Sequence, residues 1–526
     1  MSKAFQDSLK KLSDLNLIDF SKFSKRGIEK ESLRVNNANI SSSDHPKSLG
    51  AALTNPFITT DFSEALLELI TQKSSSIEKS LSDLKLILAF THQNIDDVIW
   101  PGSIPCSIQN EADIRIANYG TSNSGRLKEL YRIGLSYRYG SMMQCVSGIH
   151  YNFSLNKDFF KKWQGSHAAF QPFQDDKYLN LIRNFRKNAW LLIYLFGASP
   201  VVPNTFLTNR NNFLDSLNSK DSYLKNATCL RMSELGYMSE AQDNLNIAYN
   251  NLDEYISDLK HALTKKHAPY EKIGLKKNDK HIQINDSVIQ IENEYYSSIR
   301  PKRVIKSGQR PINVLRDQGI EYVEVRCLDN NPFLKGSIDK NTAYFIEAYL
   351  MISLIDESYS FDENRIEEIQ ENWHNTVRNG RDPNLLLKRD GKTISVKSAA
   401  EEVFNKIYDF ACALPIEAND LKNNVLKSLE VQKSKVIDSD LTPSGMILKE
   451  MEEKKITWDE FCDSKAQENI TYYKAFKKDT TNIKIASETS IKDLMDLESL
   501  KEVDFDTFLK DYLNAIQGDT YESICL

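Results

Sequence analysis

The fold is decided by the stretch Arg26-Gly27-Ile28-Glu29-Lys30-Glu31-Ser32-Leu33-Arg34-Val35, which has the pattern of a short β-strand. Side chains two residues apart in a strand point to the same face, so Glu29 and Glu31 are predicted to lie side by side. Two buried carboxylates repel each other unless protons or a cation compensate, and a divalent metal ion is the usual partner of converging oxygen ligands. The alternative is a solvated strand edge, and carboxylates elsewhere in the chain must decide between the two.

The composition is that of an ordinary globular protein. The chain has 526 residues, of which 27% are charged and 40% are hydrophobic, so it can bury a large core. Its formal net charge of -6 argues against nucleic acid as a partner, because phosphate binding needs a basic surface. The sequence has no apolar run of about 18 residues and no signal-peptide pattern at its start, so we expect no association with a membrane.

The cysteines and histidines form no metal or redox motif. Seven cysteines are scattered along the chain, and none has the Cys-x-x-Cys spacing of a zinc ribbon or a redox pair. The eight histidines are also dispersed, without a His-Glu-x-x-His motif. This pattern fits reduced thiols and predicts a cytoplasmic location.

Helical and strand patterns are mixed along the chain without regular alternation. Helices are expected over 3–20, 61–70, 77–96 and 181–197, and strands over 26–35, 144–155, 281–297 and 320–328. From about residue 340 the pattern is mainly helical, with Pro443 as a break. These features predict an α+β fold with a helical C-terminal third rather than a doubly wound βαβ protein.

The glycine motifs that usually hold nucleotide phosphates are absent from the sequence. The nearest candidate is the segment 119–126, Tyr-Gly-Thr-Ser-Asn-Ser-Gly-Arg, which leads into a helix that carries Tyr131 and Arg132. Free N–H groups at a helix N-terminus can bind an anion. Simple capping of the helix by Ser122 or Ser124 explains the same residues equally well.

Further carboxylates follow in the segment 61–70. Asp61 stands where a helix N-cap belongs, and Glu64 completes a capping-box pattern, so Glu64 is assigned a structural role. Glu68 lies between Leu66-Leu67 and Leu69-Ile70, where a carboxylate needs a partner. Asp61 and Glu68 are seven residues apart and would share one face of a helix. They are interpreted either as metal ligands or as a surface stripe.

Two later strands add polar residues on one face. In 144–154, Gln144, His150, Asn152 and Ser154 alternate with apolar residues, and Gly148 leaves room for the floor of a cleft. His150 is kept as a site residue, and its role stays open between hydrogen bonding and metal binding.

In 321–328, Glu324 and Arg326 face the same way, either in a site or as an ion pair on a solvated face. The basic segment 300–303, expected as a turn, either binds phosphate or is a solvated charge run. Together these carboxylates and basic groups form the set that metal-assisted phosphoryl transfer requires.

These motifs resemble those of the proteobacterial type of glutamate–cysteine ligase (γ-glutamylcysteine synthetase). The resemblance is carried by 26–35, 58–68, 119–126, 147–154, 195–200, 230–233 with 236–237, 299–303 and 321–333. It is nearly continuous from about 26 to 335, fades through 340–430 and is partial around 441–444. The final 50 or so residues carry no recognisable motif.

The resemblance implies a fold similar to the glutamine synthetase superfamily: a curved, mainly antiparallel sheet that forms a funnel-shaped active site, surrounded by helices. Residues 1–340 would form the catalytic core and 341–526 a mainly helical region packed on it. It also implies ATP-dependent ligation of the γ-carboxylate of L-glutamate to the amine of L-cysteine through γ-glutamyl phosphate, the first step of glutathione biosynthesis. The implied cofactor is Mg²⁺, with Mn²⁺ as a substitute and ATP as co-substrate, and no obligatory protein partner is expected.

The resemblance further implies roles for individual residues. The metal ligands would be Glu29, Glu31, Asp61, Glu68, Glu324 and His150. The residues around the amino-acid substrates would be Tyr131, Arg132, Gln144, Arg231, Tyr237, Tyr296 and His150. Arg326 would contact the transferred phosphoryl group, and with Glu29 and Glu324 it would be catalytic.

Two other functions stay open at this point. One is a sister carboxylate–amine ligase that uses the same funnel with a different amine acceptor. The other is a metal-binding or regulatory protein without activity, which a missing carboxylate would favour, although every matched position is present. A bifunctional enzyme that also makes glutathione is not expected, because the chain leaves no room for a second ATP-binding catalytic domain.

Overall fold

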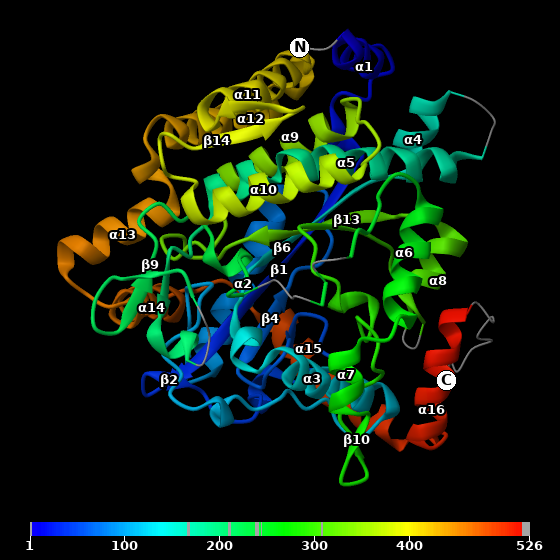
Figure 1. Cartoon of the computed structure of the whole chain (residues 1–526), viewed down its shortest axis with the longest axis vertical. Helices are drawn as coiled ribbons and strands as arrows, with labels where there is room; N and C mark the ends of the chain where they lie inside the picture. The colour runs from blue at the N-terminus through cyan, green and yellow to red at the C-terminus, as the bar shows by residue number, and fades with distance from the viewer. Residues whose placement is uncertain are drawn as a thin grey trace.

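A computed structural model describes residues 3–165, 169–208, 212–236, 241–242, 245–306 and 309–517 (Figure 1). At its centre is an eight-stranded sheet in which every paired strand is antiparallel to its neighbour. The main strand order is β12 (Ile299–Lys302), β13 (Tyr322–Leu328), β6 (Ile149–Leu155), β1 (Ser24–Asn36), β4 (Leu66–Ile70) and β3 (Ile58–Thr60). The short strands β2 (Asn39–Ile40) and β5 (Val98–Ile99) pair with the far end of β1.

Helices surround this sheet and dominate the second half of the chain (Figure 1). The helices of the first half are α1 (Lys3–Asp14), α2 (Ile77–Asn94), α3 (Asn123–Tyr139), α4 (Lys157–Gln164), α5 (Phe170–Phe196), α6 (Leu252–Thr264), α7 (Ala268–Ile273) and α8 (Pro311–Gln318). The later helices are α9 (Lys340–Ile355), α10 (Glu363–Asn379), α11 (Val396–Ala413), α12 (Asn419–Ile437), α13 (Pro443–Lys454), α14 (Trp458–Lys474), α15 (Thr481–Ser499) and α16 (Phe505–Asn514). The predicted α+β class with a helical C-terminal region is therefore confirmed.

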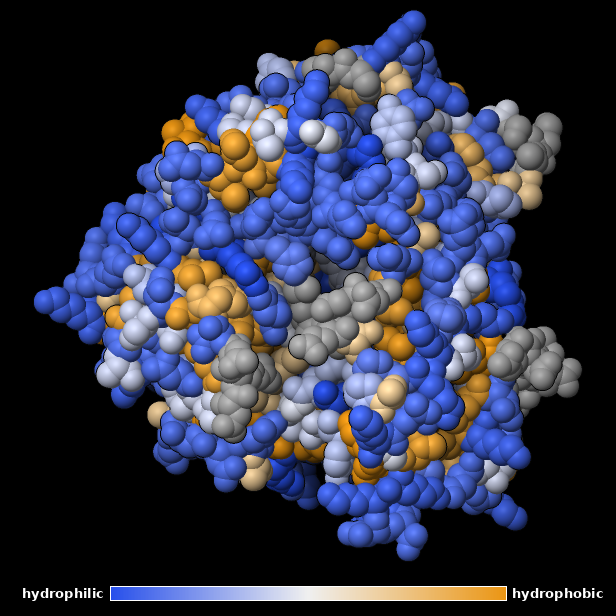
Figure 2. Space-filling view, viewed as in Figure 1, coloured by the Kyte–Doolittle hydropathy of each residue, from blue (hydrophilic) through white to orange (hydrophobic). Residues whose placement is uncertain are grey.

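Three small sheets complete the described elements. They are β7 (Val201–Pro203), β9 (Asp221–Tyr223) and β8 (Asp215–Ser216); β10 (Lys276–Lys277) with β11 (Lys280–His281); and β14 (Leu386–Arg389) with β15 (Lys392–Ser395). No helix among the residues described here is both long enough and apolar enough to cross a membrane. Hydrophilic residues cover most of the face in Figure 2, and apolar residues gather there only in separate patches.

One face of the central sheet packs on helices α5 and α9. Alternate residues of the strands, such as Ile28, Tyr151 and Val325, are buried in this core. Burying each such side chain contributes about 1.5–3 kcal/mol. Glu347 of α9 is buried in the same layer, where it accepts hydrogen bonds from Arg26 (2.7 and 2.8 Å) and from the Tyr151 hydroxyl (2.7 Å). Because helices cover this face, the opposite face is left for a pocket.

The helix predicted over 61–70 is wrong, because this segment is the β3–β4 hairpin. β4 lies between β1 and β3, and the turn is closed by a hydrogen bond from Asp61 N to Leu66 O (2.9 Å). Glu64 caps no helix. Its carboxylate accepts hydrogen bonds from His45 N (2.6 Å) and Asn118 N (2.8 Å). The structural role assigned to Glu64 therefore holds with other partners.

Four other predictions need correction. The strand expected over 281–297 is mostly a loop, because side chains satisfy its backbone: Gln290 accepts from Ile284 N (3.0 Å), and Glu294 accepts from Gln290 N (2.7 Å). Gln144 lies in a 3₁₀ turn, Met142–Cys145, before β6 begins. The basic segment 300–303 lies mostly in strand β12, not in a turn. The first helix also ends at residue 14, earlier than expected.

Candidate active site

The open face of the sheet lines a pocket of about 450 Å³ together with helix α3. Strands β1, β4, β6, β12 and β13 all contribute side chains to it. The charged and histidine residues among the lining are Glu29, Glu31, Asp61, Glu68, Lys128, Arg132, His150, Arg300, Lys302, Glu324 and Arg326. Acidic side chains and basic side chains thus share one cavity.

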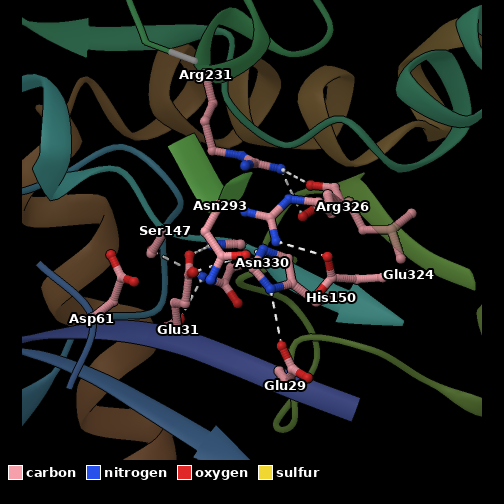
Figure 3. A network of polar contacts seen from close by, with 12 residues as sticks. Glu29, Glu31, Asp61, Ser147, His150, Arg231, Asn293, Glu324, Arg326 and Asn330 are labelled. Carbon is pink, nitrogen blue, oxygen red and sulfur yellow. Dashed lines mark hydrogen bonds and ion pairs between the residues drawn. The ribbon is translucent and has the colours of Figure 1, made fainter. Parts of the chain in front are cut away.

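The acidic centre of this pocket lies where three strands run side by side. Glu29 of β1 is the cross-strand partner of His150 in β6, and Glu31 is the cross-strand partner of Glu68 in β4. His150 Nδ1 lies 3.2 Å from a Glu29 oxygen, and its Nε2 lies 3.7 Å from a Glu31 oxygen (Figure 3). One ligand atom each from Glu29, Glu68 and His150 fits within a 4.8 Å span, which suits a single metal ion.

The electrostatics of these carboxylates confirm that their charges are crowded. Burial, and then the charges of Glu29, Asp61 and Glu31, hold the pKa of Glu68 well above its usual range. Burial also raises the pKa of Glu31, although His150 opposes the effect. Buried like charges of this kind favour protons or a cation as compensation. The solvated strand edge considered for Glu29 and Glu31 does not describe this site.

A basic group faces the acidic centre from β12 and β13. Arg326 Nη1 donates to Glu324 Oε2 (3.0 Å), and Lys302 Nζ lies 3.7 Å from the other oxygen of Glu324. Burial alone would raise the pKa of Glu324, but Lys302 and Arg326 outweigh it and hold this pKa well below the usual range. The Glu324–Arg326 pair therefore lines the pocket and is not a solvated surface pair.

Five of the predicted substrate-binding residues line the pocket, namely Tyr131, Arg132, Gln144, His150 and Tyr296. Arg132 donates through Nε to Asp61 O and lies 3.9 Å from the Asp61 carboxylate. Gln144 Nε2 donates to the Tyr296 hydroxyl (3.4 Å). Tyr237 lies outside the described residues.

Arg231 takes a different position from the other predicted residues. Its side chain is 1% exposed and lies behind the pocket wall, where Nε donates to Asp329 Oδ1 (2.6 Å) and Nη2 donates to Leu328 O (2.9 Å; Figure 3). It is not among the lining residues, so its predicted contact with a substrate stays a prediction.

The segment before α3 is closed by the chain itself. The Ser122 hydroxyl accepts from Gly125 N (3.3 Å), as expected of an N-cap. Glu498 accepts from Thr121 N (2.5 Å), and Glu502 accepts from Asn123 N (2.7 Å). The capping alternative is therefore the one that the structure supports, and these N–H groups already face carboxylates.

Sequence reasoning missed several lining residues. Lys128 lies four residues before Arg132 on α3, and this helical spacing was the signal that could have found it. Tyr512 reaches the pocket from α16, where no motif marks it. Other polar lining residues that were not assigned to the site from the sequence are Thr59, Thr60, Asn293 and Tyr322.

Comparison with known proteins gives consistent matches. A family profile described as glutamate-cysteine ligase matches residues 9–376. The chain is 39% identical over 520 residues to a glutamate–cysteine ligase from Janthinobacterium sp. (strain Marseille), covering 97% of this chain and 98% of that protein. It is 41% identical over 501 residues to the glutamate–cysteine ligase of Pseudomonas aeruginosa (strain UCBPP-PA14), with 94% of each covered.

Solved structures agree with these sequence matches. The fold is similar to that of a glutamate–cysteine ligase from Francisella tularensis in complex with AMP, with a TM-score of 0.88, 38% identity, and coverage of 94% of this chain and 98% of that one. A bifunctional glutathione synthetase from Pasteurella multocida shares the fold at a TM-score of 0.68 and 22% identity, where the match covers 91% of this chain and 57% of that one.

Proposed function

The chain belongs to the glutamate–cysteine ligase family and is a ligase, and from this premise we propose that its pocket joins L-glutamate to L-cysteine at the expense of ATP. The product would be γ-glutamylcysteine, with ADP and phosphate released. The observation that carries the proposal is the set of carboxylates and His150 on facing strands, opposite Lys302 and Arg326. The AMP bound to the Francisella relative supports a nucleotide site in this fold.

The donor set fits Mg²⁺, with Mn²⁺ as a substitute. Carboxylate oxygens are the ligands that these hard cations prefer, and Glu29, Glu68 and His150 supply a convergent group. Glutamate and ATP would add more negative charge to an already crowded site. Two unit charges about 4 Å apart interact by about 4 kcal/mol at an effective dielectric near 20. When bound, the metal would neutralise the nucleotide phosphates and hold them in place. We also propose Glu31, Asp61 and Glu324 as ligands.

The proposed chemistry has two steps. A γ-carboxylate oxygen of glutamate attacks the γ-phosphorus of ATP, ADP leaves, and γ-glutamyl phosphate forms. The amine of cysteine then attacks the acyl carbon, loses a proton, and expels phosphate that carries one oxygen from glutamate. Arg326 and Lys302 line the pocket and would stabilise the negative charge of the transferred phosphoryl group. Glu324 orients Arg326 through their 3.0 Å hydrogen bond.

The amino-acid substrates are proposed to bind on the α3 side of the pocket. Tyr131, Arg132, Gln144 and Tyr296 line this side, and the Arg132 guanidinium suits a substrate carboxylate. Roles for Arg231 and Tyr237 in substrate binding stay part of the proposal.

We further propose that 1–340 form the catalytic core, because all strands of the central sheet lie there. Residues 341–526 would pack on that core, and Tyr512 brings this region to the pocket. A cytoplasmic location and the absence of an obligatory protein partner stay predictions.

An ATP-coupled ligation assay with mass detection tests the proposal. With glutamate, cysteine, ATP and Mg²⁺, we expect ADP release that depends on cysteine and a product with the mass of the dipeptide. Glutamate labelled with ¹⁸O in its γ-carboxylate should deliver one label to phosphate, as the acyl phosphate requires. Other amino acids tested as acceptors distinguish a sister ligase, which would prefer one of them over cysteine. No ADP release with any acceptor would contradict a ligase function.

A further inference from the structure

Asp329 lies directly after strand β13 and holds four donors without reaching the pocket. Its Oδ2 accepts from Ala198 N (2.7 Å), the Ser199 hydroxyl (2.6 Å) and the Cys229 thiol (3.1 Å). Its Oδ1 accepts from Arg231 Nε (2.6 Å). The Asp329 side chain is fully buried, and it is not among the residues that line the pocket.

Arg231 connects Asp329 to an irregular part of the sheet, because its guanidinium bonds both Asp329 and the end of β13. The register between β13 and β6 shifts between Val325 and Leu328, which marks a bulge. A bulge removes backbone groups from the regular ladder, and buried carbonyls need other donors. Arg231 Nη2 donates to Leu328 O (2.9 Å) and approaches Arg326 O (3.5 Å). The guanidinium therefore lies against the carbonyls on both sides of Cys327.

The same guanidinium packs against the start of β6. A Cβ atom at Gly148 would lie 2.9 Å from the Arg231 guanidinium carbon and 2.8 Å from Leu328 O, so only glycine leaves space for this packing. The Gly148 N–H donates to Glu31 Oε2 (3.0 Å). The room at Gly148, expected to open a cleft, is thus filled by Arg231.

The next residue braces the same region. Asn330 Nδ2 donates to Glu31 O (2.9 Å) and to the Ser147 hydroxyl (3.1 Å; Figure 3). Asp329, acting through Arg231, and Asn330 therefore connect the end of β13 to β1 and to the start of β6. These two strands present Glu29, Glu31 and His150 to the pocket.

We propose that Asp329 is a positioning residue for the reaction assigned above. Its carboxylate holds Arg231 against the β13 bulge, and the bulge in turn directs Arg326 toward Glu324 and the pocket. This inference rests on the proposed function, because it places Arg326 at the transferred phosphoryl group. A buried ion pair adds little net stability over an apolar pair of the same shape, so its effect is expected mainly in geometry.

A double-mutant cycle between Asp329→Asn and Arg326→Lys tests this inference in the full-length protein. Asp329→Asn is expected to lower kcat about 10-fold, in line with the loss of groups that orient catalytic residues, with a smaller change in KM. In the Arg326→Lys background, the same substitution should change kcat less than about 3-fold, because the group that it positions is already altered. An equal loss in both backgrounds would overturn the proposal.

The same double-mutant cycle is also measured as the Kd of ATP in the presence of Mg²⁺. This binding measurement still tests the inference if Arg326→Lys is inactive. Asp329→Asn should weaken this binding in the wild-type background and leave it nearly unchanged beside Arg326→Lys. If the wild-type protein makes no γ-glutamylcysteine, the proposed function is wrong. The binding cycle still tests the role of Asp329 in that case, because it does not depend on ligation. Equal weakening in both backgrounds counts against that role.

Glu347→Gln is the matched control, because Glu347 of α9 forms an equally buried ion pair with Arg26 of β1 (2.7 Å) on the core face of the sheet, opposite the pocket. Glu347→Gln should lower the melting temperature by about as much as Asp329→Asn does, and it should leave kcat within about 3-fold of wild type. If Asp329→Asn fails to fold, Ser199→Ala replaces it as a milder variant that removes one donor. Its expected loss, about 3-fold in kcat, should also vanish beside Arg326→Lys, and a loss that persists would overturn the inference.

Discussion

Glu31 of β1 and Glu68 of β4 are direct cross-strand partners in the central sheet, and both line the pocket. Like charges directly opposite each other destabilise a sheet, and burial raises the pKa of both carboxyl groups here. The fold therefore carries an electrostatic cost at this pair of strands. A bound cation would relieve it, and this relationship leads to the first prediction.

Magnesium is expected to stabilise the protein without any substrate. Because a ligand that binds the folded state at 100 times its Kd adds about 2.7 kcal/mol, Mg²⁺ should raise the melting temperature by a few degrees. Glu68→Gln should raise the melting temperature of the metal-free protein and reduce the magnesium-induced shift. Glu430→Gln, at an exposed position on α12, is the control and should keep the full shift. Thermal denaturation over a magnesium titration measures both effects, and an unchanged shift in Glu68→Gln would exclude Glu68 as a ligand.

Glu29→Gln and Glu324→Gln are each expected to abolish ligation and to leave the fold intact. The first removes a charge from the metal group, and the second removes the negative charge that pairs with Arg326. We expect a loss in kcat of more than about 100-fold, with unchanged circular dichroism. Glu321→Gln is the control, because Glu321 borders β13 and is not among the lining residues. Unchanged turnover of either variant at saturating magnesium would refute the assignment.

Lys30→Met is expected to stabilise the protein most at low pH. Lys30 is buried on the opposite face of β1 from Glu29 and Glu31, and burial lowers its pKa from 10.5 to about 7. The Lys30 amine therefore binds a proton more readily in the unfolded chain than in the folded protein. Below about pH 7 the amine is charged in both states, and its burial lowers the free energy of unfolding by the full amount. Between about pH 7 and pH 10.5 this loss of stability declines to zero. A shift of this size corresponds to roughly 5 kcal/mol.

Urea denaturation of wild type and Lys30→Met at several pH values measures this effect. The difference in the free energy of unfolding should shrink steadily as the pH rises from 7 to 10. A difference that stays constant over this range would show that packing, not charge, distinguishes the two proteins.

Tyr512→Ala is expected to weaken substrate binding, although Tyr512 lies far along the sequence from the motifs that carry the family resemblance. Helix α16 is held at the rim of the pocket by Asp506, which lies 2.8 Å from His281 and 3.2 Å from Lys276, and by Asn313, which donates to Ala515 O (2.7 Å). Removing the ring opens one wall, so KM for at least one substrate should rise about 10-fold, as loss of a buried aromatic contact worth about 1.4 kcal/mol would produce.

Separate measurement of KM for ATP, glutamate and cysteine identifies the substrate that Tyr512 contacts. Tyr408→Ala, on the exposed surface of α11, is the control and should leave all three values unchanged. If all three values are also unchanged in Tyr512→Ala, this wall does not touch a substrate.

Most of the sheet could be predicted because its strands alternate. β1, β6 and β13 place apolar residues in the core and polar residues in the pocket, and this period of two is visible in the sequence. The hairpin 58–70 could not be recognised in this way, because β4 is flanked by strands on both sides and is apolar on both faces apart from Glu68. Its apolar run suits a helix and a buried strand equally well.

Site residues that belong to short sequence motifs could be predicted, whereas those positioned by long-range packing could not. Glu29, Glu31 and Glu324 belong to short motifs, and the structure brings them into one pocket. The position of Arg231 behind the wall depends on the β13 bulge and on Asp329, which pairs with it from 98 residues away. Tyr512 depends on the docking of α16 onto α3, the β10–β11 hairpin and α8, which are distant from it in the sequence. Such long-range packing leaves no periodic trace in the sequence.

The contribution of α16 to the pocket also affects how the protein is made. The first wall, strand β1, leaves the ribosome early, whereas Tyr512 emerges almost 500 residues later. At 5–20 residues per second, this interval is roughly 25–100 seconds of translation. During that time the crowded carboxylates of a nascent chain would face the solvent without their last wall. The complete pocket can form only after synthesis has passed α16.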